Sequence, residues 1–400
     1  MRTTNTPPRL TTLYLMAALS PLTLNMIAPS LANIADDLRA DYALISLALG
    51  GYLAVTAVAQ LGIGPLSDRI GRRPVLLTAV SVFTLGSLGC AMSQDATVFL
   101  AFRMLQAGAI ACSVLSMAIV RDTQDGPHVS AILSRIAMAM AVAPMLGPMV
   151  GSAFDAAFGW RAVFVLYAAA GAGVLCLFWL DLGETAPVHA AVAEPSEHRL
   201  VPLLADPLFW SYVFSTALSV GGFFVFIAGA PLIASAVFGV TTTTVGLIVG
   251  SITAGYFVGS FLSSRLALKH LQTTIMLWGR LVACGGALAG LGALALGAST
   301  PLLYFGFTVF VGLGNGLTLP NSNAGAMSVR PRLAGTAAGI SGATTLALGA
   351  VLTTATAAAL SARPSAEGFL IILLLVCTAG LVAAISAKKL EQRAAQIAAR

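Results

Sequence analysis

Long stretches without any charged side chain constrain this chain more than any other feature. Residues 207–264 contain no Asp, Glu, Lys or Arg, and neither do residues 281–329. Each stretch is about twice the roughly 20 residues that a helix needs to cross a bilayer. We therefore expect each of them to form two membrane-spanning helices joined by a turn.

The composition excludes a soluble protein of this size. Hydrophobic residues make up 58% of the chain and charged residues 9%, whereas soluble domains carry about 25% charged residues. The apolar residues form continuous runs, unlike the alternating strands of a transmembrane β-barrel. The sequence therefore predicts an all-α polytopic membrane protein, and it excludes a cytosolic enzyme, a secreted disulfide scaffold and a disordered protein.

Charged residues mark the ends of the predicted spans. We expect 12 transmembrane helices, which form one six-helix bundle in residues 1–182 and a second in residues 207–400. Residues 183–206 are hydrophilic and predict a flexible cytoplasmic linker. The spans cover residues 10–35, 42–67, 74–94, 96–120, 136–154, 162–180, two within 207–264 with a turn at 239–242, two within 271–329 with a turn at 297–301, 333–362 and 368–387.

The basic residues predict the orientation. With both termini in the cytoplasm, only Arg39, Arg161 and Arg363 of the 21 Lys and Arg residues lie in outer loops, as the positive-inside rule requires. The first span is too long for the core of a signal peptide. We therefore predict a multi-pass membrane protein with both termini in the cytoplasm, and the net charge of +6 reflects this topology and not nucleic-acid binding.

The cysteines and histidines form no metal-binding pattern. All five cysteines fall in apolar spans without ligand spacing, and the four histidines fall in predicted inner loops. We expect no metal and no cofactor. No span offers paired acids or a Cys/His cluster, so a membrane-embedded enzyme is a remote alternative, as is a purely structural membrane protein.

The most specific motif lies in the predicted loop after the second span, at residues 64–74 (GPLSDRIGRRP). Gly64 is expected to allow close helix packing and Gly71 a tight turn. Asp68 places a carboxylate at the membrane edge, where it can pair with arginines. With a second cluster after the fourth span, the predicted charge network is Gly64, Asp68, Arg69, Gly71, Arg72, Arg73, Arg121 and Asp122.

These segments resemble the motifs of a known family. Residues 64–74 resemble motif A of the major facilitator superfamily, residues 103–122 motif B, and residues 143–151 motif C, the antiporter signature. The form of motif B, together with residues 222–231, is similar to the Bcr/CflA-type multidrug exporters. The resemblance implies drug:proton antiport by alternating access, a small-molecule substrate, no cofactor and a monomer in the lipid bilayer. It also implies that the charge network steadies the outward-open state and that helix five bends and packs closely at Pro144, Gly147, Pro148 and Gly151.

Arg103 is the predicted buried charge of the fourth span. It lies about seven residues into the span, roughly 10 Å deep, and a buried arginine costs at least about 2.5 kcal/mol. It must therefore face a cavity or polar partners, and Gln106 can share its network. The resemblance links this arginine to proton coupling and to the polarity of the substrate site. Arg280 lies nearer a helix end, and we expect it to snorkel to the interface.

The first span departs from the exporter pattern at one position. Residues 22–29 match the pattern except that Asn25 stands where the pattern has aspartate, and asparagine cannot titrate. No acid lies deep in a predicted span. A neutral or anionic substrate is therefore easier to accommodate than a strongly cationic one, and any proton coupling must use Asp36, Asp37 or Asp122.

Polar, aromatic and methionine side chains on several spans suit a pocket for varied apolar ligands. Core packing is the alternative for the aromatic and Met residues, and helix–helix hydrogen bonding is the alternative for the Asn residues, among which Asn321 and Asn323 also stand out. The leading hypothesis is an exporter of small amphipathic compounds, for example chloramphenicol-like drugs. The alternative is a facilitator or importer of a nucleoside or organic anion. The predicted substrate-binding residues are Tyr14, Asn25, Met26, Arg103, Gln106, Met138, Met145, Phe223, Phe224, Phe226, Tyr256 and Asn315.

Overall fold

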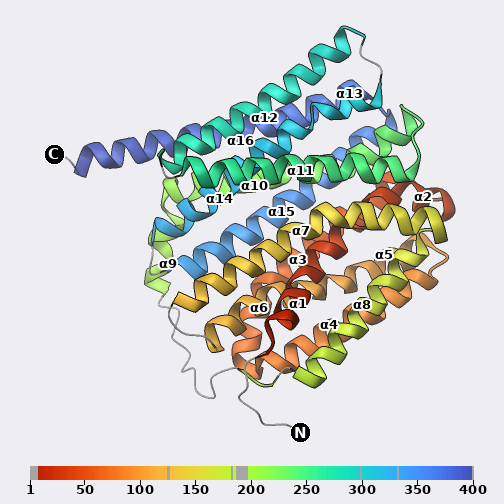
Figure 1. Cartoon of the computed structure of the whole chain (residues 1–400), viewed down its shortest axis with the longest axis horizontal. Helices are drawn as coiled ribbons and strands as arrows, with labels where there is room; N and C mark the ends of the chain where they lie inside the picture. The colour runs from red at the N-terminus through yellow and green to blue at the C-terminus, as the bar shows by residue number, and fades with distance from the viewer. Residues whose placement is uncertain are drawn as a thin grey trace. The chain divides into compact units, whose positions relative to one another are not determined.

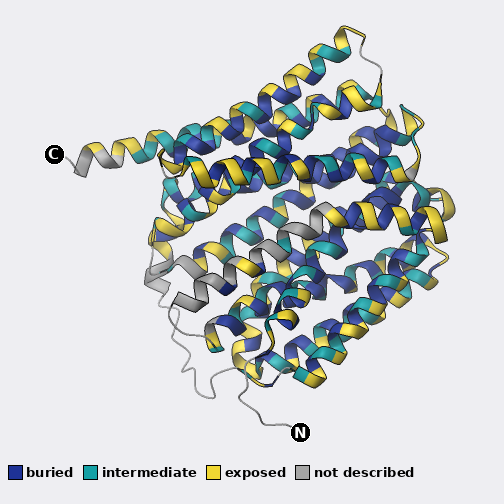
Figure 2. Cartoon of the chain, viewed as in Figure 1, coloured by how far each residue is buried: buried dark blue, intermediate teal, exposed yellow. Residues whose placement is uncertain are grey.

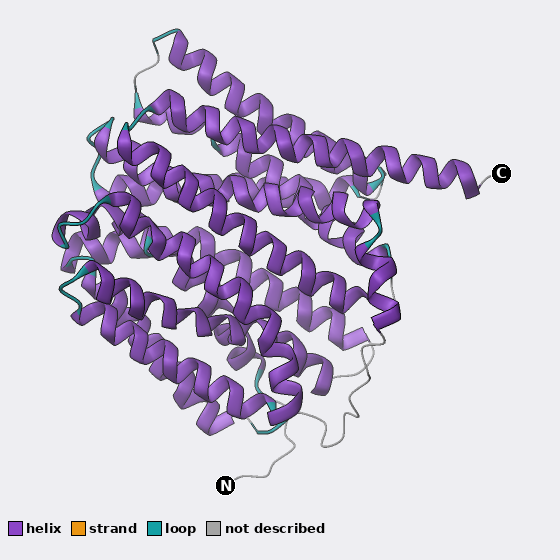
Figure 3. Ribbon diagram, turned by 180° about the vertical axis from the view of Figure 1, so that it is seen from behind, coloured by secondary structure: helices purple, strands orange, loops and turns teal. Residues whose placement is uncertain are grey.

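The structure is a computed structural model that describes residues 8–123, 127–181, 183–185, 197–267, 269–297, 300–330 and 333–398. Within these ranges every regular element is a helix and none is a strand (Figure 3). The chain divides into two compact units, Met1–Ala193 and Glu194–Arg400. The division falls inside the hydrophilic segment that the sequence predicts as a linker.

Within the described residues, 11 helical segments are long and apolar enough to cross a membrane. The helix α7 (Pro127–Phe158, 32 residues) lies at the position of the remaining predicted span. The prediction of an all-α polytopic membrane protein is therefore confirmed.

Unit 1 contains two spans that are interrupted by short 3-10 helices. The first span is built from three pieces, and its break contains Pro29, which has no N–H to continue an α-helix. The fourth span is interrupted after Leu105, where η2 begins at Gln106. The elements are α1 (Leu10–Asn25), η1 (Ala28–Ser30), α2 (Leu31–Asp37), α3 (Tyr42–Ile70), α4 (Arg72–Met92), α5 (Ala96–Leu105), η2 (Gln106–Ala109), α6 (Ile110–Thr123), α7 and α8 (Arg161–Asp181).

Unit 2 has its turns where the sequence predicts them. Gly239 (φ +63°) lies between the seventh and eighth spans, and Gly297 (φ +86°) follows the ninth. Both glycines adopt backbone angles that other residues rarely adopt, so both predicted turns are confirmed. The elements are α9 (Glu197–Leu204), α10 (Pro207–Ala236), α11 (Thr242–Leu266), α12 (Gln272–Ala295), α13 (Pro301–Gly306), α14 (Val309–Ser328), α15 (Ala334–Ala362) and α16 (Ala366–Ala398).

The predicted flexible linker is partly helical. Its last part forms α9, in which Leu203 is fully buried. Leu203 packs against Phe209 and the other core residues of unit 2, and this burial of an apolar side chain fixes the segment. Asp206 then begins α10 by accepting a hydrogen bond from the Leu208 N–H at 2.9 Å. The prediction of a flexible linker is therefore wrong for residues 197–206, and residues 186–196 lie outside the described residues.

The same pairing of helices recurs in both units. In unit 1 the first span packs on α7 and α4 packs on α8, and in unit 2 α10 packs on α15 and α12 packs on α16. The second and fourth spans of each unit also pack together, as α3 with α5 and α6, and as α11 with α14. Figure 1 shows these neighbours running side by side within each unit. Each half is thus a six-helix bundle built on one packing plan.

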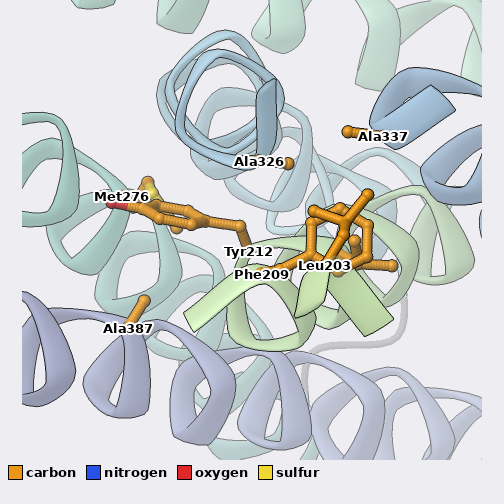
Figure 4. Close-up of a cluster of buried hydrophobic side chains, with 8 residues drawn as sticks. Leu203, Phe209, Tyr212, Met276, Ala326, Ala337 and Ala387 are labelled. Atoms are coloured by element: carbon orange, nitrogen blue, oxygen red, sulfur yellow. The ribbon is translucent and has the colours of Figure 1, made fainter. Parts of the chain in front are cut away.

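Buried residues occur along the helices of both units (Figure 2). One cluster in unit 2 joins helices α9, α10, α12, α14, α15 and α16 (Figure 4). Small side chains on three of these helices allow close approach to the large ones on the others. The cluster consists of Leu203, Phe209, Tyr212, Val213, Met276, Ala326, Ala337 and Ala387.

Candidate functional site

Arg103 lies at the centre of unit 1 and is fully buried. Its Nε donates to the Ala48 carbonyl at 3.0 Å, and its two terminal nitrogens donate to the Gln106 Oε1 at 2.5 Å and the Thr23 carbonyl at 3.0 Å. All three acceptors are neutral. The prediction that Arg103 has polar partners is confirmed, and the alternative in which it snorkels to the headgroups is excluded.

Further side chains extend this arrangement across the bundle. The Gln106 Nε2 donates to the Ser87 hydroxyl at 2.8 Å, and the Tyr167 hydroxyl donates to the Thr23 carbonyl at 3.0 Å. The guanidinium carbon lies 4.3 Å from the centre of the Tyr52 ring, a distance at which cation–π attraction is effective. The network, which we call the Arg103 network, therefore joins α1, α3, α4, α5, η2 and α8.

The Arg103 network holds a positive charge without a carboxylate. None of the ion pairs in the described part of the chain includes Arg103. Burial of the charge costs at least about 2.5 kcal/mol, and three hydrogen bonds from a charged donor, each contributing about 1.5–3 kcal/mol, offset this cost. The network therefore holds a guanidinium charge in the interior of unit 1.

The motif C glycines bring α7 directly against the first span. A Cβ built on Gly151 would lie 2.8 Å from the Met26 carbonyl carbon, and one on Gly147 would lie 3.2 Å from the Asn25 Cβ. Pro148, between them, is buried. The close packing that the sequence predicts here is present, whereas the side chains of Pro144, Met138 and Met145 lie outside the described ones.

Asn25 and Met26 belong to this α1–α7 contact and are 1% and 0% exposed. The Asn25 Nδ2 donates to the Pro21 carbonyl at 2.6 Å. Its Oδ1 is buried without a hydrogen-bond partner among the described residues. Asn25 therefore packs against α7 and is not one of the hydrogen-bonding partners of Arg103.

Arg72 is the centre of the motif A charges. It is 8% exposed, forms an ion pair with Asp68, and its Nε lies 3.0 Å from the Asp122 Oδ2. Gly71, at φ +100°, provides the sharp turn between α3 and α4. The structure therefore brings together Asp68, Arg72 and Asp122. Arg69 is exposed, and the side chain of Arg121 lies outside the described ones.

Glu184 is an acid of this site that the sequence analysis missed. Its carboxylate accepts hydrogen bonds from the backbone N–H groups of Arg72 at 2.9 Å and of Arg73 at 3.3 Å. It therefore caps the N-terminus of α4, where a negative charge is favoured. The sequence offers only a weak signal, because Glu184 belongs to no motif and is one of two acids, with Asp181, just after the sixth span.

One sequence prediction is wrong in physical detail, and another stays a prediction. A Cβ on Gly64 would meet no atom within 4 Å among the described residues, so its predicted role in close helix packing is not seen within unit 1. Arg280 is fully buried and does not snorkel, because its Nε donates to the Thr318 hydroxyl at 3.0 Å and a terminal nitrogen donates to the Asn315 Oδ1 at 2.5 Å. Asn315 is thus a partner of Arg280.

The remaining predicted pocket residues of unit 2 differ in exposure. Phe226 is fully buried, with its ring 6.4 Å from that of Phe305 and 6.1 Å from that of Phe369. Phe224, 5% exposed, packs over Gly349. Both lie in the core of unit 2, whereas Phe223 and Tyr256 are half-buried.

The last three polar residues that the sequence analysis singled out are Tyr14, Asn321 and Asn323. The Tyr14 hydroxyl is buried without a partner among the described residues. The Asn321 Nδ2 donates to the Ser263 hydroxyl at 2.7 Å and so bonds α14 to α11. Asn323 is exposed, and its Oδ1 accepts from the Thr216 hydroxyl at 3.5 Å. Whether any of the pocket residues binds a substrate stays a prediction.

The profile of the Major Facilitator Superfamily matches residues 13–354. The chain belongs to this superfamily. It is therefore a membrane transporter and not an enzyme, and small molecules are its substrates.

Curated relatives support the assignment. The uncharacterized MFS-type transporter YdgK of Bacillus subtilis (strain 168) is 31% identical over 259 residues, which cover 63% of this chain and 64% of that protein. The multidrug resistance protein MdtL of Shigella dysenteriae serotype 1 (strain Sd197) is 30% identical over 331 residues, or 82% of this chain and 83% of MdtL. MdtL of Escherichia coli O9:H4 (strain HS) matches to the same extent.

Solved structures support the fold alone. A bacterial homologue of the human lysosomal transporter Spinster, in an inward-facing and unoccupied conformation, matches with a TM-score of 0.76 at 17% identity, over 95% of this chain and 97% of that chain. The same homologue in an inward-facing and occupied conformation matches with a TM-score of 0.77 at 17% identity, over 97% and 98%.

Proposed function

We propose that this protein exports small, amphipathic, neutral or anionic compounds across the bacterial inner membrane by proton antiport. The relatives named multidrug resistance protein MdtL support drug efflux. The observation that carries the choice of substrate is the buried guanidinium of Arg103 with its neutral partners. We further propose that both termini are cytoplasmic and that the protein works as a monomer.

The charge of Arg103 acts through its electric field, because the side chain itself is fully buried. If a charged substrate binds about 10 Å from the guanidinium and the effective dielectric constant is about 20, the Coulomb energy between the two unit charges is about 1.7 kcal/mol. Arg103 would favour an anion by that amount and disfavour a cation equally, so its field separates the two by about 3.4 kcal/mol, or roughly 300-fold in affinity. A chloramphenicol-like neutral compound experiences neither effect.

The two bundles, residues 1–182 and residues 207–400, are proposed as the parts that move during alternating access. The ion pairs of Arg72 with Asp68 and Asp122 support a role for motif A in steadying one state of the cycle. Replacement of Asp68 by Asn removes the charge and keeps the shape. The variant is expected to reach the membrane normally and to transport poorly.

The test is chloramphenicol transport by the full-length protein. Wild-type protein in proteoliposomes is expected to accumulate labelled chloramphenicol when a proton gradient is imposed, and to raise the resistance of an efflux-deficient host. Asp68→Asn is expected to lose most of both activities, while the control Glu367→Gln, at an exposed acid on α16, keeps them. Wild-type export by Asp68→Asn would contradict the role of motif A.

A facilitator or importer of a nucleoside or organic anion is the second candidate. Asn25 motivates it, since the first span lacks the titratable acid of the exporter pattern. Such a protein would equilibrate its substrate by counterflow without a gradient and would confer no resistance. Asn25→Asp, which restores the acid, tests the difference: it should increase gradient-driven export if the chain is an exporter.

A further inference from the structure

Asp155 is a buried carboxyl group in unit 1 that the proposed transport mechanism does not use. The helix α7 continues beyond the predicted end at residue 154, and Asp155 is 6% exposed. The Asn33 Nδ2 donates to its Oδ2 at 2.9 Å. The buried Ser30 hydroxyl lies beside the same carboxyl and makes no hydrogen bond of normal geometry among the described residues.

The position of Asp155 continues the face of α7 that packs on the first span. Gly147, Gly151 and Asp155 follow at intervals of four residues and therefore share one side of the helix. The glycines pack against Asn25 and Met26, and Asp155 faces the pieces that follow the break in the span. Figure 1 shows α2 beside the end of α7. We call this contact the α7 seam.

The charged groups nearest to this end of α7 leave Asp155 without a cation. The neighbouring elements contribute Asp36 and Asp37 on α2, Arg39 directly after α2, and Arg161 on α8. Arg161 is paired with Asp37, at 2.6 Å between Nη1 and Oδ2. None of these groups forms an ion pair with Asp155 in the described ranges. Arg135, on α7 itself, lies 20 residues before Asp155, roughly 30 Å away along the helix.

We propose that Asp155, with Asn33 and Ser30, forms a proton-binding site at this end of unit 1, and that its occupancy sets how tightly the first span packs on α7. The proton comes from bulk water and forms an O–H bond on the carboxyl oxygen that Asn33 does not occupy. The resulting neutral acid donates to the Ser30 hydroxyl, while the Asn33 bond to the other oxygen remains. Loss of the proton regenerates a carboxylate, beside which the Asn33 amide and the Ser30 hydroxyl are neutral groups.

The two protonation states favour different packing. A buried carboxylate that lacks a cation is costly to keep away from water, so the deprotonated site favours water entry and a looser α7 seam. Protonation removes this buried charge, so the protonated site keeps the first span packed closely on α7. Asp155 thus provides an ionisable group beside the first span, whereas the side chain of Asn25 cannot titrate. The effect on transport rests on the proposed proton-coupled export.

Infrared spectroscopy of the purified full-length protein tests proton binding without any substrate. In vesicles of phosphatidylethanolamine and phosphatidylglycerol, the wild type is expected to gain the absorption band of one buried protonated carboxyl as the pH is lowered. Asp155→Asn should lose that band, Asp155→Glu should keep it, and Asp37→Asn, at the exposed neighbouring acid, should leave it unchanged. An unchanged band in Asp155→Asn overturns the proposal, and Asp155→Glu covers the case in which the Asn variant does not fold.

Chloramphenicol transport then tests the consequence. Asp155→Asn is expected to lose the dependence of chloramphenicol counterflow on the pH at this end of the protein, whereas the control Glu367→Gln is expected to keep that dependence. The same pH dependence in Asp155→Asn as in the wild type would overturn the role in packing. If the wild type moves no chloramphenicol at all, the proposed function fails while the infrared result still decides whether Asp155 binds a proton.

Discussion

The contact between α7 and the first span predicts how far alanine lowers the free energy of unfolding at its two glycines, Gly151 and Gly147, relative to Gly64 on α3. A Cβ on Gly151 would collide with the Met26 carbonyl group, lying 2.8 Å from its carbon and 3.1 Å from the Met26 Cα. Carbon atoms in contact prefer about 3.5–4.0 Å, so the helices must separate. Overpacking of this kind costs about 1–3 kcal/mol, or roughly five- to 150-fold in the folding equilibrium.

The other two glycines provide matched comparisons. At Gly147 the nearest atom, the Asn25 Cβ, would lie 3.2 Å away, and at Gly64 nothing lies within 4 Å. We therefore expect Gly151→Ala to lower the free energy of unfolding most and Gly147→Ala less. Gly64→Ala should be neutral or stabilising by up to about 1 kcal/mol, because alanine favours helix. Unfolding of the three variants in detergent measures the order, and equal losses at Gly151 and Gly64 would refute the reasoning.

Two further predictions concern the interior of unit 2. A double-mutant cycle with Arg280→Met and Asn315→Leu should give a coupling energy of about 1–3 kcal/mol in the free energy of unfolding, because the two side chains share a charged hydrogen bond of 2.5 Å. Additive losses in the two single variants would show that this hydrogen bond contributes nothing. Phe226→Ala should lower the free energy of unfolding by about 3–5 kcal/mol, because it leaves a cavity beside Phe305 and Phe369. The control Phe214→Ala, at a ring that is 43% exposed, should lower it far less. Similar losses in the two variants would contradict the core position of Phe226.

The spans and turns could be predicted from the sequence because a membrane leaves few alternatives. Backbone groups in lipid must be hydrogen-bonded within a helix, so apolar length and charge position determine where the helices lie. Gly239 and Gly297 mark turns for the same local reason, their positive φ angles. The sequence also predicts polar partners for Arg103, since a buried guanidinium requires hydrogen-bond acceptors.

The partners across helices could not be predicted from one sequence. Nothing in the chain near Arg280 shows that Asn315 and Thr318, one turn apart on α14, face it. Asp155 directly follows the span predicted to end at residue 154, although the helix continues and buries it. Glu184 likewise belongs to no motif, and only the fold places its carboxylate at the N-terminus of α4. In each case the missing information is the packing of one helix on another.

The two buried guanidiniums differ in the order in which their acceptors are synthesised. Thr23 and Ala48 precede Arg103 in the chain, so both carbonyl groups have been synthesised before the fourth span. Asn315 and Thr318 follow Arg280, so the ninth span is translated before both of its acceptors. Until the tenth span has been made, the Arg280 guanidinium lacks these two hydrogen bonds.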